Sequence, residues 1–113
     1  MIYGVLEIEI MNAIWDMQEQ NEDRNIAISD VVDMLKENNV FRAYTTIKTV
    51  MDRLVSKGIL ARFKSGKKFF YTTTVSRIEA KRNTINEVSN QFFNGNFEEM
   101  IRFIEQNQEV VFA

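Results

Sequence analysis

The sequence predicts a mainly α-helical chain with one small β-hairpin. Several stretches carry apolar residues at spacings of three and four, which is typical of amphipathic helices. After Gly58 the apolar period changes to two, which indicates strands. The chain has 113 residues, of which 45% are hydrophobic and 27% charged. This composition is that of a globular protein, and the length predicts one compact domain, or a small domain with an appended element, rather than two full domains.

The first helix is expected over residues 5–20. Its apolar residues predict one buried face: Leu6, Ile10, Ala13, Ile14 and Met17. Trp15 is expected to pack at the edge of this face. Residues 19–25 are polar and charged, so we expect a loop after the helix.

A second, shorter helix is expected after a very short strand at residues 26–28. Ser29 suits the N-cap, because its hydroxyl oxygen can accept a hydrogen bond from a free backbone N–H. Asp30 and Asp33 favour the positive start of this helix. Its buried side is expected to hold Val31, Val32, Met34 and Leu35. The helix should end at Asn38.

The third helix is expected over residues 44–57, before Gly58, which can adopt the left-handed conformation that follows many helices. Its buried residues follow the spacing of one helix face: Ile47, Val50, Met51 and Leu54. The other face then exposes hydroxyl and charged groups: Thr45, Lys48, Thr49, Asp52, Arg53 and Ser56, with Thr46 beside them. Residues 59–64 and 69–74 predict two strands, joined by a turn at 65–68 that carries two lysines.

Two further helices are expected after the hairpin. Ser76 with Glu79 fits a capping box, Gly95 interrupts the helical pattern, and Asn96 with Glu99 forms a second capping pattern. Because little of the chain remains to cover these helices, we expect their apolar stripes to form a homodimer interface. The expected interface residues are Ile78, Ile85, Val88, Phe92, Phe97, Met100, Ile101 and Ile104. In the alternative interpretation, these helices fold back and complete the core of the monomer.

Three helices followed by a basic hairpin are typical of a winged helix-turn-helix. We therefore expect a DNA-binding domain at residues 1–75 and a helical dimerisation region at residues 76–113. The net charge of −2 hides a basic segment, residues 42–68, with eight basic residues and one acidic residue, Asp52. Screening acts over about 8 Å, so this segment can attract a polyanion whatever the total charge. The alternatives are a solvated basic face and a winged-helix module that binds protein instead.

Three segments resemble the penicillinase repressor family of winged-helix regulators. Residues 43–60, AYTTIKTVMDRLVSKGIL, resemble its recognition helix; residues 6–15, LEIEIMNAIW, resemble its opening helix; and residues 67–71, KKFFY, resemble the second strand of its wing. The resemblance implies a dimeric bacterial repressor that binds an inverted-repeat operator in double-stranded DNA. It implies that Thr46, Lys48 and Thr49 face bases. It also implies that Tyr44, Arg53 and the two lysines of the hairpin, Lys67 and Lys68, lie near phosphates. The expected DNA-binding residues are Arg42, Tyr44, Thr45, Thr46, Lys48, Thr49, Arg53, Lys67 and Lys68.

The sequence departs from two branches of that family. The chain has no cysteine, which excludes the thiolate copper sensor of the copper-responsive branch. The β-lactam branch is inactivated by cleavage of an Asn-Phe bond, and Phe103-Ile104 occupies the matching position here. The chain ends at Ala113, where longer members continue into another helix, so a smaller or weaker dimer is expected.

Several other classes of protein are disfavoured by composition. Without cysteine and histidine, the chain has no thiolate or imidazole metal ligand, no thiol nucleophile and no histidine base. Its glycines are isolated, so no phosphate-cradling loop is expected. We therefore expect no enzyme activity, no cofactor and no metal. No apolar run approaches the roughly 20 residues of a membrane span, and residues 1–6 do not resemble a signal peptide. The cytoplasm is the expected location.

Overall fold

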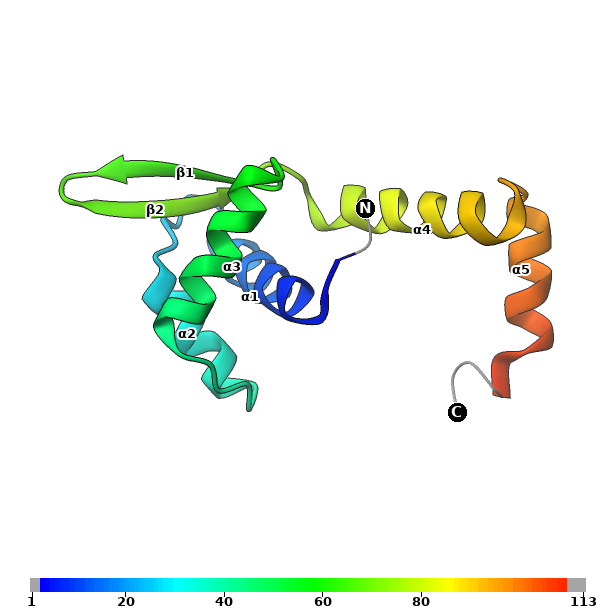
Figure 1. The fold of residues 1–113 in the computed structure, drawn as a ribbon, viewed down its shortest axis with the longest axis horizontal. Helices are drawn as coiled ribbons and strands as arrows, with labels where there is room; N and C mark the ends of the chain where they lie inside the picture. The colour runs from blue at the N-terminus through cyan, green and yellow to red at the C-terminus, as the bar shows by residue number, and fades with distance from the viewer. Residues whose placement is uncertain (1–2, 110–113) are drawn as a thin grey trace. The chain divides into compact units, whose positions relative to one another are not determined.

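The computed structural model describes residues 3–109, so residues 110–113 of the expected dimerisation region and residues 1–2 of the expected DNA-binding domain lie outside it. The chain divides into two compact units, one from Tyr3 to Arg77 and one that begins at Ile78. The elements, in chain order, are α1 (Val5–Gln20), α2 (Ile28–Glu37), α3 (Tyr44–Ser56), β1 (Leu60–Ser65), β2 (Lys68–Thr73), α4 (Arg77–Phe93) and α5 (Phe97–Gln106) (Figure 1). The expected mainly helical class with one hairpin is confirmed.

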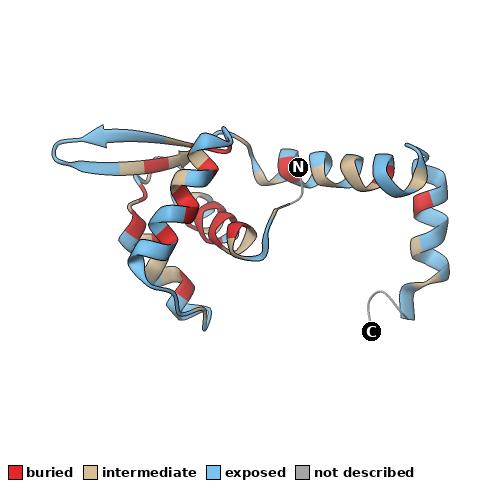
Figure 2. Ribbon diagram, in the orientation of Figure 1, coloured by how far each residue is buried: buried red, intermediate tan, exposed pale blue. Residues whose placement is uncertain are grey.

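Among the described residues of the first unit, helix α1 supplies a larger share of the core than any other element (Figure 2). Its side chains Ile10, Met11 and Ile14 are fully buried, and they share the interior with apolar residues of α2 and α3. Trp15, expected to pack at the edge of this helix face, is also buried, with 5% of its surface exposed. Its indole Nε1 donates a hydrogen bond to the carbonyl oxygen of Val75 at 3.1 Å, which satisfies the one polar group of a buried ring.

The start of α2 differs from the expectation. The helix begins at Ile28 and its N-cap is Ala27, so Ser29 is not the cap. The carboxylate of Asp30 accepts a hydrogen bond from the backbone N–H of Ala27 at 2.9 Å, so the aspartate stabilises this helix end. The strand expected at residues 26–28 is reduced to a single antiparallel bridge between Ile26 and Tyr71.

The hairpin is tighter than expected. The register pairs Leu60 with Thr73 and Ser65 with Lys68, which leaves a two-residue loop, Gly66-Lys67, in place of four residues. Gly66 has a φ of +63°, which suits the first position of a type II′ turn. Because the shorter loop lets Ser65 pair, β1 begins and ends one residue later than expected, and β2 one residue earlier.

The second unit consists of most of α4 together with α5. Helix α4 begins directly after Ser76, as the capping pattern predicted. The side chain of Asn96 accepts a hydrogen bond from the backbone N–H of Glu99 at 3.0 Å, which confirms the second cap. The rings of Phe93 in α4 and Phe103 in α5 lie 5.7 Å apart, so the two helices contact each other beside the break. Among residues 3–109, no helix combines the length and apolarity needed to cross a membrane.

Candidate nucleic-acid interface

An open groove of about 440 Å³ lies between α3 and the hairpin. Its lining residues come from the start of α2, from α3 and from both strands with their turn: Ala27, Ile28, Ser29, Tyr44, Lys48, Arg62, Lys67, Lys68, Phe69 and Tyr71. Lys48, Arg62 and the two turn lysines bring positive charge to this groove from separate parts of the chain. Among the described residues, none that lines the groove is acidic, so the lining itself carries a positive charge that favours anions.

The exposed face of α3 is rich in hydroxyl groups. Burial of Ile47, Val50, Met51 and Leu54 orients the helix, and it leaves Thr45, Thr46, Lys48, Thr49 and Arg53 exposed. The Thr49 hydroxyl donates a hydrogen bond to the carbonyl oxygen of Thr45 at 2.9 Å, and it retains lone pairs that can accept from a base. This face therefore matches the expectation from the helical period, except at Asp52.

Two of the expected contact residues lie on different sides of α3. Lys48 and Arg53 are five positions apart, which places them about 140° apart around a helix axis. Lys48 lines the groove, whereas Arg53 lies near Glu7 of α1. A hydrogen bond from Lys57 lowers the pKa of Glu7, and the charge of Arg53 adds to this effect. The groove therefore brings Lys48 together with the wing lysines, but not with Arg53.

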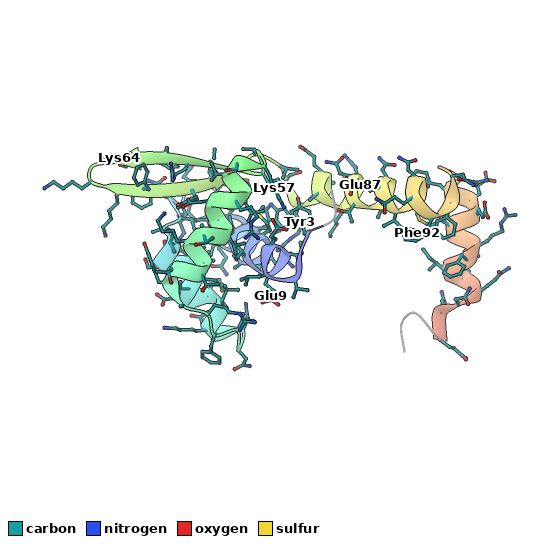
Figure 3. All side chains as sticks on the ribbon, viewed as in Figure 1. Tyr3, Glu9, Lys57, Lys64, Glu87 and Phe92 are labelled. Carbon is teal, nitrogen blue, oxygen red and sulfur yellow. The ribbon has the colours of Figure 1, made fainter. Side chains whose placement is uncertain are left out.

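Arg42 and Tyr44 flank the start of α3. Arg42 lies in the loop before the helix, where its guanidinium donates to the carbonyl oxygen of Phe41 at 3.0 Å and remains exposed. Tyr44 is the first residue of the helix, is 52% exposed and lines the groove. At the hairpin, Lys67 forms part of the turn and Lys68 begins β2. Figure 3 labels Lys57 near the end of α3 and Lys64 on the hairpin.

A cluster around Asp52 joins α3 to both strands of the hairpin. The Asp52 carboxylate accepts hydrogen bonds from Lys48 Nζ at 2.7 Å, from the Tyr71 hydroxyl at 3.0 Å and from an Arg62 guanidinium nitrogen at 3.3 Å. Arg62 also lies 4.8 Å from the centre of the Phe69 ring. We call these four residues, Lys48, Asp52, Arg62 and Tyr71, the Asp52 cluster.

The cluster shifts the pKa of two of its members. Burial raises the pKa of Tyr71 to about 12, and its hydrogen bond to the Asp52 carboxylate adds to the rise. Burial by itself raises the pKa of Asp52, but hydrogen bonds from Lys48 and Tyr71 outweigh it and hold the pKa below its usual range. Asp52 is therefore an anion at neutral pH, and Tyr71 is a neutral donor.

Sequence reasoning missed Arg62 and Tyr71 as parts of this site. The sequence shows Arg62 only as one of the basic residues of the segment 42–68. Its contact with Tyr71 depends on the hairpin register, which pairs the two residues across the strands. Asp52 was expected to face solvent, and the structure half-buries it in the cluster. Its position as the one acidic residue of a basic segment was the available signal.

The second unit exposes a set of large apolar side chains. The exposed members of the expected interface are Ile78, Ile85, Phe92, Phe97 and Ile101. Phe92, which Figure 3 labels, has 74% of its surface accessible. Val88 and Ile104 are half-buried. Met100 differs, because it is already buried within the chain. Such an apolar surface is typical of a protein–protein contact.

The chain resembles known repressors over nearly its whole length. Residues 3–111 match the family model described as "Penicillinase repressor". The penicillinase repressor of Bacillus licheniformis is 28% identical over 90% of this chain and 75% of its own length. That of Staphylococcus aureus is 27% identical over 95% of this chain and 79% of its own length.

Two other matches are more limited. An uncharacterized 16.5 kDa protein of Latilactobacillus sakei is 38% identical over 68% of this chain, and the match spans only 48%, about half, of that relative. The solved ferric uptake regulator of Francisella tularensis matches with a TM-score of 0.51 and 16% identity, covering 81% of this chain and 80% of that chain. At this identity the likeness shows the fold alone, and it agrees with the expected winged helix.

Proposed function

The chain belongs to the penicillinase repressor family, and from this premise we propose that it is a DNA-binding transcriptional repressor that acts as a homodimer on an inverted-repeat operator. Helix α3 would enter the major groove, and the hairpin would lie along the sugar-phosphate backbone. This is a role in binding, and the family is one of repressors rather than of enzymes.

The observation that carries the proposal is the groove between α3 and the hairpin. Four cationic side chains from three separate segments line it: Lys48, Arg62, Lys67 and Lys68. Lysine and arginine at a concave surface bind phosphates, and they release counterions from DNA when they do so. The hydroxyl groups of Thr45 and Thr49 lie on the exposed face of α3, the helix that also carries Lys48, and there they can reach base edges.

Different residues of this surface have different proposed roles. Thr46, Lys48 and Thr49 would contact bases, whose pattern of donors and acceptors distinguishes one operator from another. Arg42, Tyr44 and the two turn lysines would contact phosphates, which position the protein without reading sequence. Arg53, on the far side of α3 from the groove, would contact a different stretch of backbone from that of the hairpin.

The exposed apolar surface of α4 and α5 supports the homodimer. Side chains such as Phe92 and Ile101 would be covered by the same helices of a second chain, in the two-fold arrangement that is commonest among homo-oligomers. A two-fold dimer presents two recognition helices to two half-sites about 34 Å apart, which requires an operator of inverted symmetry.

The wing lysines provide the direct test. Binding of wild type and of the Lys67→Ala/Lys68→Ala variant to a mixed-sequence duplex should be measured by fluorescence anisotropy at a series of salt concentrations. Each phosphate contact that is lost should reduce the slope of log affinity against log salt by about 0.9. We therefore expect the variant to bind more weakly at low salt and with a flatter salt dependence.

A matched variant controls for the change in total charge. Lys81→Ala/Arg82→Ala removes two exposed positive charges from α4, and it should change the slope much less. An unchanged slope in the Lys67→Ala/Lys68→Ala variant would contradict the proposed role of the hairpin. Wild type without salt-dependent binding to any duplex would contradict the function itself and favour a winged-helix module that binds protein.

A further inference from the structure

Asp52 is the single acidic residue within residues 42–68, and it lies on the surface that the proposed function assigns to DNA. A carboxylate there is unfavourable for phosphate binding, because it repels the backbone. The structure nevertheless bonds this carboxylate to three donors from three elements: Lys48 of α3, Arg62 of β1 and Tyr71 of β2. Such convergence indicates a specific role.

We propose that Asp52 is a positioning and specificity-determining residue of the DNA-binding surface. It would hold Lys48 and Arg62 in fixed places at the groove, and it would cancel part of their charge so that phosphates alone bind weakly. This inference rests on the proposed function, and it adds a residue whose role is to limit affinity for DNA of the wrong sequence.

The positioning role follows from the geometry of the Asp52 cluster. Lys48 and Arg62 carry like charges on different elements, and they would repel each other without an anion between them. Asp52 accepts from Lys48 through Oδ2 and from Arg62 through Oδ1, so each cation has its own carboxylate oxygen. Both cations remain 40–50% exposed, so they are held in place and still accessible to a ligand.

The carboxylate cannot easily move away when DNA approaches. Its Oδ1 accepts from the hydroxyl of Tyr71, a side chain that is only 1% exposed. The backbone N–H of Tyr71 donates to the carbonyl oxygen of Ile26 at 2.8 Å, which ties the tyrosine to the segment before α2. Asp52 therefore stays close to both cations, and it is already anionic at neutral pH because its pKa is lowered.

The charge balance sets the effect on binding. Two cations that share one fixed carboxylate have a net charge of +1 and therefore neutralise one phosphate. Without the carboxylate, the same two cations would neutralise two phosphates. The slope of log affinity against log salt is proportional to the number of neutralised phosphates, so Asp52 should lower the magnitude of this slope by about 0.9. Lys48 held by Asp52 can still donate its remaining hydrogens to a base at the correct operator, where positioning compensates for the lower charge.

The Asp52→Asn variant tests both the positioning role and the effect of the charge on specificity. The asparagine keeps the size of the side chain and an acceptor for the Tyr71 hydroxyl, but it removes the charge. In anisotropy titrations with a mixed-sequence duplex, we expect the slope to steepen by about 0.9 and binding at 0.1 M salt to tighten about 8-fold. On a duplex that wild type selects from a random pool, affinity should rise less, so the ratio of specific to mixed-sequence affinity should fall.

Two further variants make the result decisive. Glu105→Gln removes one exposed negative charge from α5 and should leave the slope near that of wild type. Asp52→Ser is a second route to the same charge removal if Asp52→Asn fails to fold, which circular dichroism would show. A slope for folded Asp52 variants equal to that of wild type would overturn the inference, and so would an unchanged affinity ratio. If wild type shows no salt-dependent duplex binding, the proposed function falls and this inference falls with it.

Discussion

The hydroxyl of Tyr71 joins the hairpin to α3, and its removal should destabilise the protein by a measurable amount. Tyr71→Phe keeps the buried ring and deletes only the oxygen that donates to Asp52 at 3.0 Å. A hydrogen bond to a charged acceptor contributes about 1.5–3 kcal/mol. Because Asp52 is partly exposed and keeps its bonds to Lys48 and Arg62, we expect the lower end of this range, about 1.5 kcal/mol.

Urea denaturation at pH 7, followed by circular dichroism, measures this loss. For a unit of this size, each kcal/mol lowers the melting temperature by about 4–8 °C, so thermal melts give an independent value. Tyr44→Phe is the matched control, since Tyr44 is 52% exposed and its hydroxyl removal should change the free energy of unfolding by less than about 0.5 kcal/mol. A loss for Tyr71→Phe as small as that of the control would refute the anchoring of the hairpin by this bond.

The same bond predicts a dependence of stability on alkaline pH. Burial, with the Asp52 hydrogen bond, raises the pKa of Tyr71 to about 12, from an ordinary value of 10.0. A group whose pKa is raised by folding stabilises the protein fully below its unfolded pKa, and this contribution is lost as pH rises through the folded pKa. Wild type should therefore lose stability between pH 10 and about 12 more steeply than Tyr71→Phe. Parallel curves for the two proteins would contradict the raised pKa.

The proposed dimer and the buried carboxylate of Glu7 give two further predictions. Phe92→Asp/Ile101→Asp should sediment as a monomer and lose tight operator binding, because one half-site contact alone is weak; a double variant that remains dimeric would place the interface elsewhere. Glu7→Gln should lower the free energy of unfolding at pH 7 by about 1–3 kcal/mol, because Glu7 is buried and accepts from Lys57 Nζ at 2.8 Å. That hydrogen bond holds the pKa of Glu7 below 4.5, so its contribution should be complete above pH 4.5 and be lost as pH falls through the lowered pKa of the folded protein; a difference from wild type that does not shrink on acidification would argue against the pair.

The helices were predictable because each carries a strong local signal. The apolar period of α1 placed its limits at Val5 and Gln20, as the structure has them, and Asn96 marked the start of α5. One error occurs where two local signals compete. At the start of α2, both Ser29 and Asp30 can stabilise a helix end, and the bridge of Ile26 to Tyr71 decides between them by fixing the chain before Ile28.

The site was predictable in its parts but not in its connections. The helical period was enough to place Lys48 and Thr49 on the exposed face of α3, because that face depends only on neighbouring residues. The contact of Asp52 with Arg62 and Tyr71 depends on the hairpin register and on the packing of the hairpin against α3. Those are non-local features, and a shift of one residue in the register would turn both strand side chains to the other face.

The distribution of charge affects the orientation in which DNA would approach the proposed binding surface, as well as the affinity of binding. Outside residues 42–68 the chain carries an excess of acidic residues, so the rest of the chain, taken together, does not attract a phosphate backbone. In the proposed mode, DNA would be attracted most strongly when α3 and the hairpin face it, which would favour the correct orientation during encounter. Asp52 applies the same principle within the surface itself. By opposing the charge of Lys48 and Arg62, it makes stable binding depend on the base contacts of α3, since phosphate attraction alone is weakened where the two elements meet.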